Sequence, residues 1–108
     1  MGMLSFGGGR SYDEFKRQIT PSSLPVFEEL RNFRISLNQN VVEDVRMHRI
    51  VFGKSMTFRW FADVEPQEEG VIVKIQKNRK ESPKIVNIKL EQELDSTKGL
   101  ISNAYESI

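Results

Sequence analysis

The chain has 108 residues, of which 38% are hydrophobic and 29% charged, and its formal net charge is +1. This length suits one globular domain and excludes a second, and no segment approaches the roughly 20 consecutive apolar residues of a membrane-spanning helix. The chain has no cysteine, which excludes disulfides and thiolate chemistry, and its single histidine cannot complete a tetrahedral zinc site. We therefore expect no metal, no cofactor and no membrane partner.

The first ten residues, "MGMLSFGGGR", are rich in glycine and have no hydrophobic periodicity. We expect a flexible tail over 1–10, followed by a single domain over 11–108. The same segment lacks the basic start and the continuous apolar stretch of a secretory signal, which favours a cytoplasmic protein.

Two helices are predicted next. "SYDE" at 11–14 is a capping box, in which Ser11 accepts a hydrogen bond from the amide three residues later, and it begins a helix over about 12–19. Ser23 and the early Pro25 begin a second helix, whose apolar residues recur at helical spacing up to Leu37. The "NQN" at 38–40 ends this helix, and "VVEDV" is expected to add one helical turn.

From Met47 the hydrophobic period changes to two, which indicates strands. In the aromatic stretch "SMTFRWFADV" (55–64), the predicted inner face is every second residue: Met56, Phe58, Trp60, Ala62 and Val64. "VIVKIQK" (71–77) and "KIVNIKL" (84–90) follow after turn-rich links, so four strands form an antiparallel meander.

A last helix, capped by Asp95 or Ser96, closes the domain. Its predicted inner side consists of Leu100, Ile101, Ala104, Tyr105 and Ile108. The order helix, helix, four strands, helix predicts a two-layer α+β fold, with the four-stranded meander packed against two N-terminal helices and one C-terminal helix.

The predicted register places Arg49 opposite Arg59 on the outer face of the sheet, and Phe61 opposite Lys74. Opposed arginines repel unless an anion or acid lies between them, and an exposed ring among cations is typical of a sheet that stacks bases and holds phosphates. The candidate binding face consists of Arg49, Arg59, Phe61, Lys74, Asn87 and Lys89. The alternative is that the first helix or a second subunit covers Phe61, Ile72 and Ile85.

The sequence contains few candidates for catalytic or ligand-binding residues. Cations concentrate in 46–61 and 74–89, which favours an anionic partner. The basic residues between the last two predicted strands, Lys77, Arg79, Lys80 and Lys84, can equally form a solubilising edge of the sheet. His48 has no nucleophile near it in the sequence. A metal-dependent nuclease needs an acid followed by an acid-x-lysine strand, yet Ile72 and Asn87 occupy the place of the second acid. We expect no enzyme.

The succession of "LPVFEELR", "VVEDV", "RIVFGKSMTFRWFADVEPQEEGVIVKI" and "LISNAYESI" carries a family resemblance. Over about residues 26–108 the chain resembles a small prokaryotic domain family of unknown function, sometimes labelled "predicted transport protein", chiefly at Phe58, Pro66, Ala104 and Tyr105. The resemblance implies a helix, a meander and a closing helix, and it supplies no catalytic residues.

These observations predict a non-enzymatic interaction module with an unknown protein partner or with a second copy of itself. The alternative function is nucleic-acid binding through the candidate binding face. An enzyme of unknown type is the third hypothesis.

Overall fold

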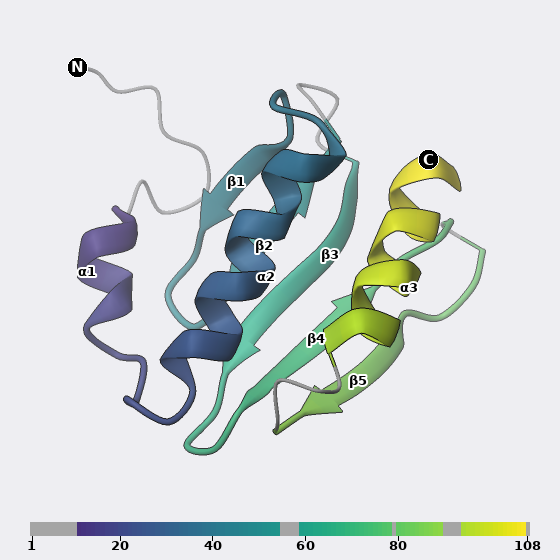
Figure 1. The fold of residues 1–108 in the computed structure, drawn as a ribbon. Helices are drawn as coiled ribbons and strands as arrows, with labels where there is room; N and C mark the ends of the chain where they lie inside the picture. Colours follow the sequence, from purple (N-terminus) through teal and green to yellow (C-terminus); the bar gives the residue numbers. More distant parts are fainter. Residues whose placement is uncertain (1–10, 55–58, 79, 90–93, 108) are drawn as a thin grey trace.

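The computed structural model describes residues 11–54, 59–78, 80–89 and 94–107 (Figure 1). The elements, in chain order, are α1 (Tyr12–Lys16), α2 (Leu24–Leu37), β1 (Val42–Val45), β2 (Ile50–Gly53), β3 (Trp60–Pro66), β4 (Val71–Ile75), β5 (Lys84–Ile88) and α3 (Leu94–Ser107). The strands form one antiparallel sheet in the order β1-β2-β3-β4-β5. The α+β class and the meander are confirmed, but the sheet has five strands instead of four. The predicted tail, 1–10, lies outside the described residues.

The additional strand is β1, in the segment for which the sequence predicts a helical turn. A tight turn, in which the Arg46 amide donates to the Arg49 carbonyl (2.8 Å), pairs β1 with β2. Glu43 of β1 accepts two hydrogen bonds from Arg31 of α2, at 2.7 and 2.9 Å. Arg31 also lies over the ring of Tyr12 in α1, 3.6 Å from its centroid. The helical prediction was wrong because this strand depends on its pairing with β2 and on its contact with Arg31, neither of which is visible in its own residues.

The helices largely follow their sequence signals. Ser11 accepts the predicted capping bond from the Glu14 amide (3.2 Å), but α1 ends at Lys16 because the next three amides bond to carbonyls only three residues back. α2 begins and ends where its signals predict. α3 begins at Leu94, before the predicted cap.

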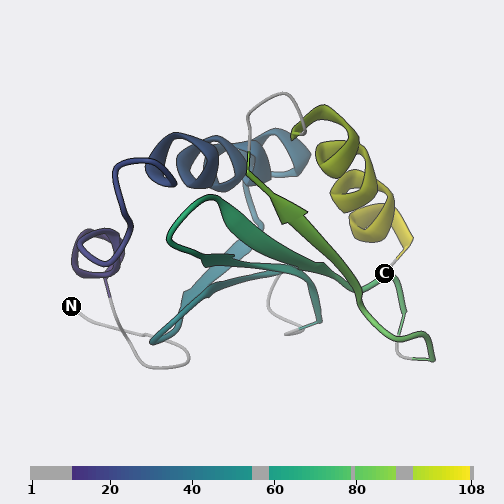
Figure 2. The same ribbon diagram turned by 90° about the horizontal axis from the view of Figure 1, so that it is seen from below.

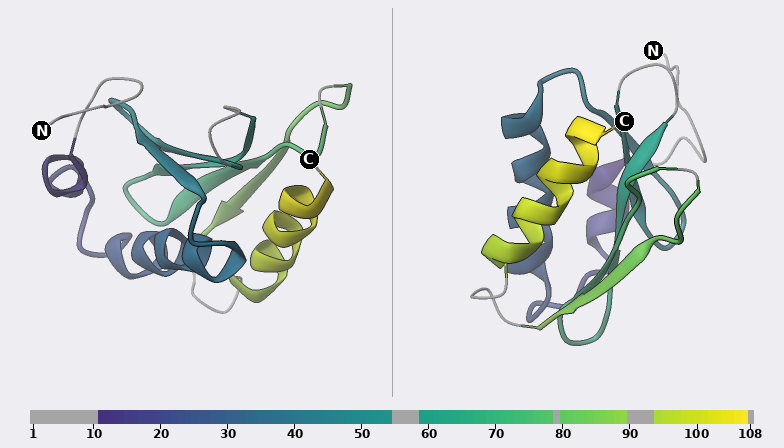
Figure 3. Two further views of the ribbon diagram at one scale, coloured as in Figure 1. Left: turned by 90° about the horizontal axis from the view of Figure 1, so that it is seen from above. Right: turned by 90° about the vertical axis from the view of Figure 1, so that its right-hand side faces the viewer.

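Both long helices cover the same face of the sheet, and across the described part of the chain no helix lies over the opposite face (Figures 2 and 3). The core lies between these two layers. Every second strand residue faces it, as in the row Val45, Ile50, Val64, Val73 and Val86. On the helix side it is closed by Phe27, Leu30, Ile101 and Ala104, all at most 2% exposed.

A β-bulge in β3 changes which aromatic ring enters this core. Phe52 of β2 pairs with Ala62, but the next residue, Gly53, pairs with Trp60, so Phe61 is an extra residue with no partner on β2. The Phe61 side chain is 0% exposed, and its ring meets that of Tyr105 in α3 edge-on, with centroids 5.3 Å apart.

The prediction that Phe61 lies on the outer face was therefore wrong, because the bulge shifts the alternation by one residue. The prediction that Trp60 lies in the core was also wrong. Its pairing with Gly53 places it on the side away from the helices, where it is half-buried. Met56 and Phe58 lie outside the described residues.

The turn between β3 and β4 is tied to the start of α2. Ser23 is fully buried, and its hydroxyl donates to the Gln67 carbonyl and accepts from the Gly70 amide, both at 2.7 Å. The sequence predicts Ser23 as a helix cap, but its side chain makes no capping hydrogen bond. Gly70 has φ of 91°, and a Cβ atom there would lie 2.0 Å from the Ile88 carbonyl oxygen. Only glycine fits this position.

We expect Gly70→Ala to lower the free energy of unfolding by at least about 2 kcal/mol, because it adds backbone strain and a clash with β5. Gly99→Ala is the matched control. A Cβ atom at Gly99 in α3 meets nothing within 4 Å, so alanine should raise the free energy of unfolding by about 0.5–1 kcal/mol. Urea unfolding followed by circular dichroism measures both changes. Equal stability of Gly70→Ala and the wild type would contradict the packing of this turn against β5.

Candidate functional site

The six residues of the candidate binding face do not share one surface. Arg59 does not face Arg49. It precedes β3, and its carbonyl accepts a hydrogen bond from the Lys54 amide (2.9 Å). Phe61 is buried against α3. The predicted ring between opposed arginines is therefore absent from the described structure.

The other four residues are at the side of the sheet away from α2 and α3 or at its end. We call this side the open face. Its central row, one residue per strand, is Asp44, Val51, Asp63, Lys74 and Ile85. The adjoining row contains Glu65, Ile72 and Asn87, and Lys89 is exposed just after β5.

The predicted pairing of β3, β4 and β5 is offset by two residues. Lys74 pairs with Asp63 and Ile85, where the sequence predicts Phe61 and Asn87. The β3–β4 hairpin closes one residue later than predicted, because the Gln67 amide bonds to the Gly70 carbonyl (2.9 Å). A shift of two residues leaves each side chain on the same face, so Lys74 and Asn87 still lie on the open face.

Asp63 is the most unusual group on the open face. The residue is 5% exposed, and its side chain is buried although no helix of the described ranges covers it. One carboxylate oxygen lies 3.8 Å from Arg49 Nε, too far for a hydrogen bond, and the other has no hydrogen-bond partner among the described residues. Burial raises the pKa of Asp63, while the nearby Arg49 and Lys74 act to lower it.

The raised pKa gives a pH-dependent prediction. Ionised Asp63 destabilises the fold above its folded pKa, and this penalty disappears as the pH falls through that value towards the ordinary pKa of about 4. Asp63→Asn is neutral at every pH. We expect the variant to be more stable than the wild type at pH 7 and to lose this advantage at pH 4.5, measured by urea unfolding. A stability difference that does not change with pH would contradict the assignment.

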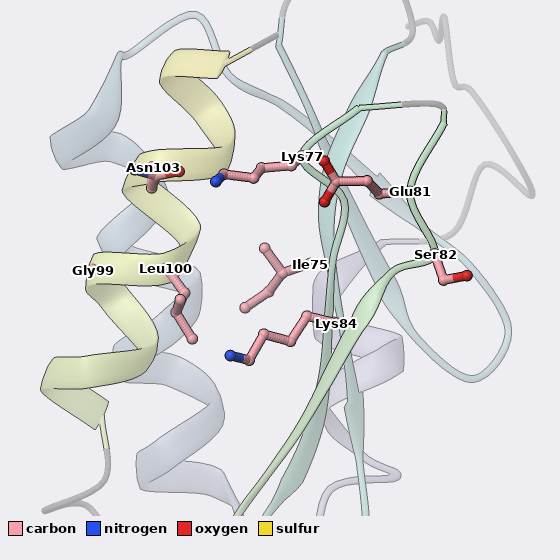
Figure 4. A pocket seen from close by; sticks show the side chains of 8 residues that line it. All are labelled: Ile75, Lys77, Glu81, Ser82, Lys84, Gly99, Leu100 and Asn103. Carbon is pink, nitrogen blue, oxygen red and sulfur yellow. The ribbon is translucent and has the colours of Figure 1, made fainter.

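A pocket of about 420 Å³ lies between α3 and the β4–β5 hairpin (Figure 4). We call it the lysine pocket. Its lining residues are Ile75, Lys77, Glu81, Ser82, Lys84, Gly99, Leu100 and Asn103. Lys77 and Lys84 extend from the hairpin towards α3 on either side of Ile75, and Leu100 faces them from the helix. The pocket therefore combines an apolar floor with two cationic groups.

The fold positions both lysines from rigid backbone. Lys84 begins β5 and pairs with Ile75, and Lys77 follows directly after Gln76, whose amide donates to the Phe61 carbonyl (2.9 Å). Gln76 also uses its side-chain amide, Nε2, to donate to the carbonyls of Asn78 and, at 2.8 Å, of Glu81. These hydrogen bonds hold the start of the hairpin loop against the end of β4.

The one carboxylate in the pocket does not neutralise the lysines. Glu81 accepts a hydrogen bond from Asn78 Nδ2 at 2.9 Å. Among the residues that the structure describes, neither Lys77 nor Lys84 forms an ion pair. Two unpaired ammonium groups beside an apolar surface attract an anion that carries an apolar part. The volume lies within the range of about 300–1,000 Å³ that is usual for small-molecule sites.

Sequence reasoning identified the cations of 74–89 but not the lysine pocket. The period-two pattern places Lys84 on the same face as Val86 and Ile88, and it places Lys77 on the same face as Val73 and Ile75, which is a sequence signal for two cations on the helix side. The position of α3 over the hairpin depends on tertiary packing. His48 is exposed in the β1–β2 turn, and the described residues contain no group of three or more His, Asp or Glu side chains placed to hold a metal ion.

Comparisons with models of protein families, with curated proteins and with solved structures find no match for the chain. The resemblance to a prokaryotic domain family therefore stays a prediction. Within the described ranges, no helix has the length and apolar character needed to cross a membrane.

Proposed function

We propose that this protein is a non-enzymatic binding module whose ligand is a small organic anion, a carboxylate or phosphate monoester with an apolar group, bound in the lysine pocket. The observation that carries this proposal is the pair of unpaired ammonium groups, Lys77 and Lys84, on either side of the buried Ile75. The anion would lie between the ammonium groups, and its apolar part would contact Ile75 and Leu100.

A binding role is favoured over catalysis by what surrounds the two lysines. Catalysis by acid and base needs a titrating group within hydrogen-bond reach of a nucleophile. The hydroxyl of Ser82 points away from both ammonium groups (Figure 4), and Glu81 is engaged by Asn78. The lysine pocket thus offers charge and apolar contact without a nucleophile and base in reach of one another.

Nucleic-acid binding through the open face is the weaker proposal. It depends on an exposed ring and on an excess of cations. Phe61 is buried, Trp60 of the open face is half-buried, and the carboxylates of Asp44 and Asp63 lie among the cations of this face. Neither feature favours a polyanion.

Phenyl phosphate is a suitable probe, because it joins a dianionic group to a ring. With about 11 non-hydrogen atoms at roughly 0.3 kcal/mol each, we expect a dissociation constant in the low millimolar range at low salt. Inorganic phosphate and benzyl alcohol, each lacking one half of the probe, should bind more weakly. Ligand-observed saturation-transfer NMR titrations suit this affinity range for the two aromatic ligands, and inorganic phosphate, which has no observable proton, is measured by its competition with phenyl phosphate.

Lys77→Met and Lys84→Met remove the charge and keep the aliphatic stem. Each should weaken phenyl phosphate binding about tenfold, the effect of losing one charge-assisted hydrogen bond. Lys80→Met is the matched control, because Lys80 belongs to the same hairpin and does not line the pocket. Equal binding by all three variants and the wild type, or no binding by the wild type, would contradict the proposal.

A further inference from the structure

Independently of the lysine pocket, we propose that the open face binds the open face of a second copy of this chain. Polar atoms on the open face lack partners in one copy. Asp44 Oδ1, Asp63 Oδ1 and Arg49 Nε are buried without a hydrogen-bond partner in the described structure. Buried polar atoms in folded proteins almost always have a partner, so we infer that these three side chains reorient towards a neighbour that supplies the missing donors and acceptors.

The missing neighbour must supply both donors and acceptors. A twofold-symmetric pair does so, because each contact between two different residues then occurs twice. The Arg49 side chain is 42% exposed, and its guanidinium lies too far from Asp63 of its own chain for a hydrogen bond, so it can donate to a carboxylate of the other copy. The reciprocal contact satisfies the same groups on the first copy.

The charge of the open face also selects a second copy. The charged side chains gathered there are Asp44, Arg46, Arg49, Asp63, Glu65 and Lys74. Three are cations and three are carboxylates, and the exposed Lys89 just after β5 adds one further cation, so the surface is close to electrically neutral. A nucleic acid or an acidic protein would meet as much repulsion as attraction, whereas a rotated copy can place each cation opposite a carboxylate.

Apolar side chains lie among these charges. Ile85 in the edge strand β5 is 58% exposed, one of the largest exposures of any hydrophobic side chain described, and Val51, Trp60 and Ile72 are half-buried. Five strands about 4.8 Å apart give a face roughly 19 Å wide. That is small for a stable interface, so we expect a dimer that dissociates in the micromolar range.

Sedimentation equilibrium of the full chain from 5 to 500 μM tests the proposal. The wild type should be a dimer at the upper concentrations. Ile85→Glu places two carboxylates in the interface and should raise the dissociation constant at least tenfold. Ile35→Glu is the matched control, since Ile35 of α2 is 56% exposed and belongs to the helix layer. It should leave the dissociation constant unchanged.

Arg49→Glu is a second variant, which reverses one of the proposed cross-copy contacts and should also favour the monomer. Circular dichroism checks that each variant is folded. A wild type that is monomeric at 500 μM overturns the proposal. So does a dimer that resists both Ile85→Glu and Arg49→Glu, or one that Ile35→Glu disrupts as strongly as Ile85→Glu.

Discussion

The bulge in β3 is the constraint on which the arrangement of the molecule depends. By inserting one residue opposite β2, it turns Phe61 to the helix side, where the ring packs against Tyr105 and helps to fix α3 over the sheet. The position of α3 in turn creates the lysine pocket between the helix and the β4–β5 hairpin. Bulges often lie beside functional sites because they redirect side chains, and this one redirects the ring that a regular strand would leave outside.

The two faces of the sheet consequently differ in chemistry. The helix side is an apolar core with charge at its margins, where Glu43 meets Arg31 at one edge and Lys84 lines the lysine pocket at the other. The open face is a mixed layer of charges and aliphatic side chains around the buried carboxyl of Asp63. We propose the lysine pocket for a small anion and the open face for a second copy of the chain, and neither site needs the other.

Local signals were sufficient for much of the fold. The capping bond of Ser11, the span of α2 and the presence and antiparallel order of strands β3 to β5 follow from neighbouring residues, and the structure agrees. β1 and the burial of Phe61 could not be predicted in this way. β1 depends on Arg31, which lies twelve residues from Glu43 in the sequence. The burial of Phe61 depends on a bulge for which the residues "RWFADV" contain no recognisable signal. The candidate site was misjudged for the same reason, because one inserted residue decides which face carries the ring.

Binding of an anion in the lysine pocket is tested most directly by measuring which backbone amide signals change when phenyl phosphate is added. In a titration followed by ¹⁵N–¹H correlation NMR, we expect the largest chemical-shift changes at Lys77, Lys84 and Gly99, with saturable curves that share one dissociation constant. Amides of the open face, such as those of Asp63 and Lys74, should stay unchanged. Chemical-shift changes centred on the open face, or no saturable change at the lysine pocket, would contradict anion binding in this pocket.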